Sequence, residues 1–142
     1  MPAPLISIRR LAATASALMF IALGLSCNKN TPFVPTGPVI SLSATQLNFY
    51  GAAGGGNPAR QLVLVRNTGV DSLHFSVTHT QSWLDLGVVP GNSADSIFAY
   101  AFISGFPAGV YYDTIMVSSD KAMNSPQLIA VTATVRPAVM IS

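Results

Sequence analysis

The amino-acid sequence predicts an all-β sandwich, and three observations support this prediction. Of the 142 residues, half are apolar, only 8% are charged and none is Glu, so the residues that usually cover surface helices are scarce. Short runs rich in β-branched, aliphatic and aromatic residues alternate with turn residues about every 8–12 positions. Beyond the first 27 residues, no stretch shows sustained helical periodicity.

Residues 1–26 are predicted to be a cleaved hydrophobic signal segment of the lipoprotein type. Arg9 and Arg10 precede fifteen uncharged residues, a run shorter than the roughly 20 residues of a membrane-spanning helix. The only cysteine, Cys27, follows "LGLS", which resembles the lipobox at which bacterial lipoproteins are acylated. Leu23 stands one position farther from Cys27 than the usual lipobox leucine. Ordinary signal cleavage and an uncleaved anchor are therefore alternatives to lipid attachment at Cys27.

Residues 27–38 are predicted to be a lipid-anchored, Pro-rich spacer, because three prolines fall between positions 28 and 38. An acyl-modified Cys27 would hold the chain on a membrane through its N-terminal lipid. The expected location is the bacterial cell envelope, at the outer membrane or cell surface in preference to the inner membrane. Asn28 is compatible with sorting to the outer membrane.

The predicted domain spans residues 39–136, with strand-like runs that follow one another in order. These runs are 39–43, 46–50, 60–67, 72–77, 82–89, 96–103, 110–119 and 127–135. Gly-, Pro- and Asn-containing turns separate most of them, the longest being "GAAGGGNPA" at 51–59. Pro137 ends the last run and leaves 137–142 as a short tail. This spacing predicts an immunoglobulin-like β-sandwich of about seven strands, or else a small barrel.

Several of these stretches together resemble the BACON family of bacterial immunoglobulin-like domains over nearly all of residues 42–135. The most specific parts are "GGGNPARQ" (54–61), the Ala108-Gly109-x-Tyr111 turn with Ile115 and Val117 after it, and "NSPQ" (124–127). The resemblance implies an immunoglobulin-like sandwich and a role in binding carbohydrate or mucin. It also implies that Trp83 lies in the core and that Tyr111 packs at a corner of the sandwich. Asp113 stands where the family usually has Gly.

The run "SIFAYAFI" (96–103) raises the main functional question. Phe98, Tyr100 and Phe102 occupy every second position, so one face of a strand would carry all three rings. The preference of large apolar groups for burial turns this face inward. The resemblance implies the opposite register, with residues 97, 99 and 101 facing inward. Both orientations stay open, and Phe98, Tyr100, Phe102 and Tyr112 are the candidate ligand-binding residues, Tyr112 being expected to face the same way as Val110 and Thr114.

The sequence indicates no catalytic chemistry, cofactor or metal site. His74 and His79 would lie on opposite faces of a strand, and we expect both to be solvent-facing polar residues. We expect turn and surface roles for Asp85, Asp95 and Asp113. From residue 27 onward five basic residues balance five Asp, so no basic surface favours nucleic acid.

The sequence therefore predicts a non-enzymatic, membrane-anchored envelope lipoprotein with a single binding domain. The expected partner is a carbohydrate or another envelope protein. The alternative is a purely structural spacer or assembly subunit that associates through the edges of its sheets.

Overall fold

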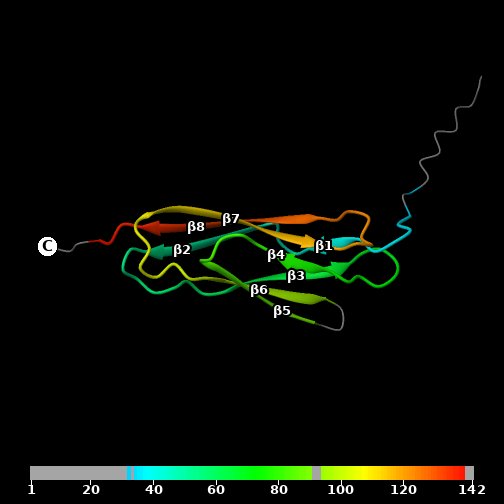
Figure 1. The fold of residues 1–142 in the computed structure, drawn as a ribbon, viewed down its shortest axis with the longest axis horizontal. Coiled ribbons are helices and arrows are strands. Elements are labelled where there is room, and N and C mark those ends of the chain that lie inside the picture. The colour runs from blue at the N-terminus through cyan, green and yellow to red at the C-terminus, as the bar shows by residue number, and fades with distance from the viewer. Residues whose placement is uncertain (1–31, 33, 91–93, 140–142) are drawn as a thin grey trace, which may run out of the picture. The chain divides into compact units, whose positions relative to one another are not determined.

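The computed structural model describes residues 32, 34–90 and 94–139. These residues contain eight β-strands (Figure 1). The strands are β1 (Ile40–Leu42), β2 (Gln46–Ala52), β3 (Gln61–Asn67), β4 (Ser76–Thr78), β5 (Leu84–Val89), β6 (Asp95–Ala101), β7 (Gly109–Ser118) and β8 (Gln127–Arg136). None of the described residues is helical. The predicted all-β class is confirmed.

The strands form two four-stranded sheets, in the orders β1-β3-β6-β5 and β2-β8-β7-β4 (Figure 1). All neighbours pair antiparallel except β2 and β8, which run parallel. Apolar side chains from the inner faces of both sheets form one buried cluster, as a sandwich requires. The predicted sandwich is therefore confirmed.

The first two strands belong to different sheets, although only three residues separate them. β1 pairs with β3 of one sheet, and β2 pairs with β8 of the other. The chain therefore crosses from one layer to the other between Leu42 and Gln46. The run at 72–77 is mostly not a strand, because only Ser76–Thr78 pairs with β7. Its alternation nevertheless holds, since Leu73, Phe75 and Val77 pack against the core.

The structure confirms two predictions made for single residues. Trp83 is only 6% exposed and belongs to the core cluster. Tyr111 is half-buried at the start of β7, where its hydroxyl donates to the carbonyl of Pro107 at 2.9 Å. Its ring meets Phe106 edge-on with the centroids 4.9 Å apart. Tyr111 thus ties the 104–109 turn to the sandwich, in the corner role expected for it.

Residues 37 and 38, at the end of the predicted spacer, are packed on the domain. Gly37 and Pro38 are buried, and their carbonyls accept hydrogen bonds from the backbone N–H groups of Val70 and Met123, at 3.1 and 2.9 Å. A Cβ added to Gly69 would lie 2.2 Å from the Gly37 carbonyl oxygen, so this close approach requires glycine at position 69. The chain is therefore held against the domain from residue 37 onward.

Candidate functional site

The rings of "SIFAYAFI" lie on the outer face of sheet β1-β3-β6-β5. Ile97, Ala99 and Ala101 are the buried positions, at 0%, 0% and 2% exposure. Phe98 and Tyr100 are half-buried, and Phe102, which follows β6, is 50% exposed. The small alanines face the core because the opposing sheet supplies the bulk there, including the fully buried Ile115, Ile129 and Phe49. Of the two orientations left open by the sequence, the structure has the outward one.

We call Phe98, Tyr100 and Phe102 the β6 strip, and its flanks differ in chemistry. On β3, Leu62 stands opposite Phe98 and is 47% exposed, which extends the apolar surface sideways. On β5, Gly87 stands opposite Phe98 and offers no side chain. The Tyr100 ring occupies the nearby space, since a Cβ at Gly87 would lie 3.7 Å from Tyr100 Cε2. Beside Phe98, the surface is therefore apolar on the β3 side and has no side chain of its own at position 87 on the β5 side.

Arg60 is part of this surface, and sequence reasoning missed it. Its guanidinium carbon lies 4.4 Å from the centroid of the Phe98 ring, in cation–π contact. Its Nη1 donates to the Tyr100 hydroxyl oxygen at 3.2 Å. Arg60 directly precedes β3, so only the pairing of β3 with β6 brings it to these rings. The alternation in each run contains no signal for that pairing.

Tyr112 lies on the other sheet, apart from the β6 strip. It belongs to β7 and stands opposite Thr132 of β8. Tyr112 is 68% exposed and shares its face with Val110 and Thr114, as expected. The four candidate ligand-binding residues therefore occupy the outer faces of two different sheets. A single ligand-binding surface can include the β6 strip or Tyr112, but not both.

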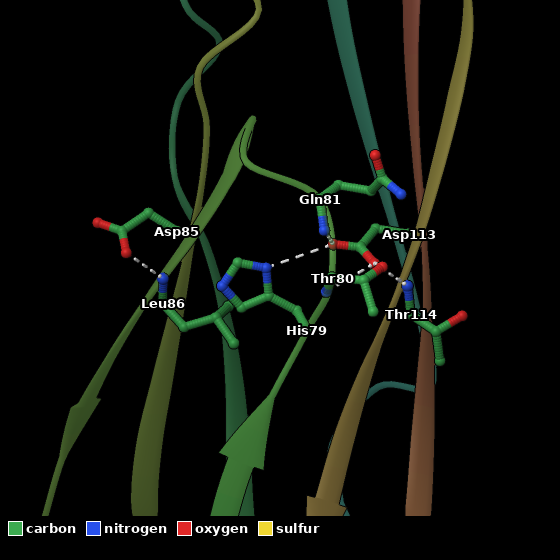
Figure 2. Close-up of polar contacts among 7 residues, drawn as sticks. All are labelled: His79, Thr80, Gln81, Asp85, Leu86, Asp113 and Thr114. Atoms are coloured by element: carbon green, nitrogen blue, oxygen red, sulfur yellow. Dashed lines mark hydrogen bonds and ion pairs between the residues drawn. The ribbon is translucent and has the colours of Figure 1, made fainter.

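The predicted turn or surface role of Asp113 is wrong, because Asp113 is only 8% exposed. Figure 2 shows the contacts of its carboxylate. Its Oδ1 accepts from the Thr80 hydroxyl at 2.9 Å, from the Thr80 N–H at 3.3 Å and from the Thr114 N–H at 2.8 Å. Its Oδ2 accepts from the Gln81 N–H at 3.0 Å. The carboxylate thus holds the segment between β4 and β5 against β7.

Hydrogen bonding decides the acidity of Asp113. Burial by itself raises the pKa of the carboxyl, but the N–H groups of Gln81 and Thr114, with the hydroxyl and N–H of Thr80, outweigh it. The pKa of Asp113 is therefore lowered from its ordinary value of 3.8. The carboxylate is ionised at neutral pH, where it accepts all of these bonds.

His79 also differs from the expected solvent-facing position. Its side chain is 25% exposed, and its Nδ1 lies 3.4 Å from Asp113 Oδ2 (Figure 2). That nitrogen is buried and makes no hydrogen bond of good geometry among the described residues. His74 is exposed, as expected. In the described part of the chain, no three His, Cys, Asp or Glu side chains are grouped closely enough to hold a metal ion.

The predicted lipid-attachment residue, Cys27, lies outside the described residues. Among the residues that are described, no helix has the length and apolar character needed to cross a membrane. The sequence matches no protein-family model, and no curated protein is significantly similar to it.

Proposed function

We propose that this chain is a non-enzymatic lipoprotein of the bacterial cell envelope, and that its sandwich domain binds carbohydrate through the β6 strip. The observation that carries the proposal is the reversed distribution of side chains on β6. Phe98, Tyr100 and Phe102 face outward, although burial would stabilise them more than it stabilises the inward alanines. Phe102 is 50% exposed and the other two rings are half-buried. Outward-facing rings are typical of interaction surfaces, and the C–H faces of sugar rings pack well on them.

The membrane anchor in this proposal rests on the N-terminal sequence. A basic start, a short apolar run and Cys27 followed by polar residues fit a lipoprotein signal, and acylation would supply the membrane affinity. Residues 27–36 would then form the link between the lipid and the domain. We place the protein at the outer membrane or cell surface.

The resemblance to the BACON family supports carbohydrate as the ligand class. The two-sheet sandwich agrees with the fold that the resemblance implies. In that family register, the positions of the β6 strip face outward and usually carry small polar residues. Three rings at these positions in this chain are thus a local departure on the exposed face, which favours a binding role over a packing role.

Association through sheet edges is disfavoured, because side chains occupy backbone groups on three of the edge strands. On β1, the Asn124 side chain accepts from the Ile40 N–H and donates to the Ile40 carbonyl, both at 2.8 Å. On β2, Gln61 donates to the Asn48 carbonyl at 2.7 Å. On β5, Asp85 Oδ1 accepts from the Leu86 N–H at 2.9 Å. A strand from a second molecule would have to displace these bonds.

The proposal predicts that the variant Phe98→Ser/Tyr100→Ser/Phe102→Ser loses carbohydrate binding. The full-length chain, purified in non-ionic detergent, is run in native gels that contain a panel of neutral and acidic polysaccharides. At least one polymer should retard the wild type, and the triple variant should bind it about tenfold more weakly or worse, since it lacks the outward-facing rings.

Two further variants distinguish a loss of binding at the β6 strip from a loss of folding. Gly87→Leu keeps all three rings in the chain and adds a side chain beside Tyr100, where a Cβ makes only ordinary contact, so it should fold and obstruct the strip. Tyr112→Ser removes an exposed ring from the other sheet and should change nothing. The proposal is wrong if no polymer binds, or if binding depends on Tyr112 and not on the β6 strip.

A further inference from the structure

Arg60, beside the β6 strip, supplies a positive charge that forms no ion pair with a carboxylate among the described residues. No carboxylate of the described residues lies within ion-pair distance of Arg60. A guanidinium has five N–H donors, and the Tyr100 hydroxyl accepts from only one nitrogen, Nη1. Arg60 itself is exposed. Its contact with the Phe98 ring and its bond to Tyr100 hold the guanidinium plane in a defined position, with most of its donors available to a ligand.

We propose that the ligand of the β6 strip is an acidic polysaccharide, whose carboxylate or sulfate groups bind Arg60 while a neighbouring sugar ring packs on Tyr100 and Phe102. This inference rests on the proposed function and adds the charge class of the ligand. It predicts a requirement for Arg60 that a neutral polysaccharide would not impose.

The position of Arg60 over Phe98 is the reason for preferring an acidic ligand. Because the guanidinium lies on the ring, an approaching sugar meets the cation at this end of the strip, and not the face of Phe98. A neutral sugar would offer the cation hydroxyl acceptors but no countercharge. A carboxylate or sulfate restores charge-assisted hydrogen bonds and can accept two parallel N–H bonds from the planar group.

Asp85 sets the direction in which the acidic group would lie. It stands opposite Tyr100 on β5, on the flank away from β3, and its Oδ1 accepts from the Leu86 N–H. The strip therefore has a cation on its β3 side and an anion on its β5 side. An acidic substituent would be attracted to the β3 side and repelled from the β5 side, which fixes the orientation of the chain of sugars across the sheet.

The experiment compares dextran, dextran sulfate and polygalacturonate as gel additives for the full-length chain in detergent. Dextran and dextran sulfate share a glucose backbone and differ in charge, and polygalacturonate supplies carboxylates in place of sulfates. The wild type should bind at least one acidic polymer more tightly than dextran. Arg60→Gln should weaken that binding about tenfold and should weaken any retardation by dextran much less. Arg60→Lys, which keeps the charge but not the planar fork, should fall between the two.

Arg136→Gln is the matched control. It removes the same charge from the other sheet, where the Arg136 guanidinium carbon lies 5.8 Å from the Tyr50 ring centroid. The inference is overturned if Arg136→Gln weakens acidic binding as much as Arg60→Gln, because the attraction is then non-specific. It is also overturned if dextran binds as well as the acidic polymers and Arg60→Gln has no effect, although the proposed function survives that result. If no polymer binds, both fall.

Discussion

Asp113→Ala should lower the free energy of unfolding by about 3 kcal/mol, a large part of the 5–15 kcal/mol typical of a domain. The variant leaves the N–H groups of Thr80, Gln81 and Thr114 without their acceptor and frees the segment after β4 from β7. Urea unfolding at neutral pH measures the loss. Asp113→Asn keeps one oxygen acceptor and should lose less.

The loss of stability in Asp113→Ala should depend on pH. Because the pKa of Asp113 is lower in the folded chain than its ordinary value of 3.8, the carboxylate stabilises the fold fully above that value. Its contribution is lost as the pH falls from 3.8 through the lowered folded pKa. The stability difference between wild type and Asp113→Ala should therefore be constant near neutrality and shrink in acid. Asp85→Ala, which removes an exposed carboxylate bonded to one N–H, should cost little at any pH. Equal losses for the two aspartates would contradict this account.

Ile97→Ala should destabilise the domain more than Phe98→Ala, although phenylalanine is the larger residue. Ile97 is fully buried between the sheets, and its truncation leaves a cavity that should cost about 2–5 kcal/mol. Phe98 lies on the outer face, where truncation loses the Arg60 contact and a half-buried ring, about 1–2 kcal/mol. Urea unfolding of the two single variants gives the order directly. The reverse order would place the strand in the opposite register.

The strand content and much of the core could be predicted from the sequence, because both depend on local patterns. Runs rich in β-branched and aliphatic residues located β3, β7 and β8, and in the structure the burial of side chains alternates along each of them. Alternation is a short-range property, which a single sequence records well. The positions of Trp83 and Tyr111 were predicted from the resemblance to the BACON family and not from alternation.

The candidate site could be predicted only in part, because it depends on which strands are neighbours. Alternation along residues 96–103 separates two faces but does not say which one meets the other sheet. Arg60 and Tyr100 are 40 residues apart and meet only through the β3–β6 pairing. Thr80 and Asp113 are 33 residues apart, so the burial of that carboxylate has no local signature. The position of Tyr112 on the other sheet could not be predicted either, because it depends on the order of the strands.

NMR with a soluble gadolinium chelate tests the outward orientation of the β6 strip directly. The chelate broadens the signals of groups that solvent reaches. We expect strong broadening of the Phe102 ring, partial broadening of Phe98 and Tyr100, and none for the Ala99 methyl or the Phe49 ring, which are 0% and 1% exposed. Sharp Phe98 and Phe102 signals beside a broadened Ala99 methyl would mean that the rings point into the core, and that no binding surface exists on this strand.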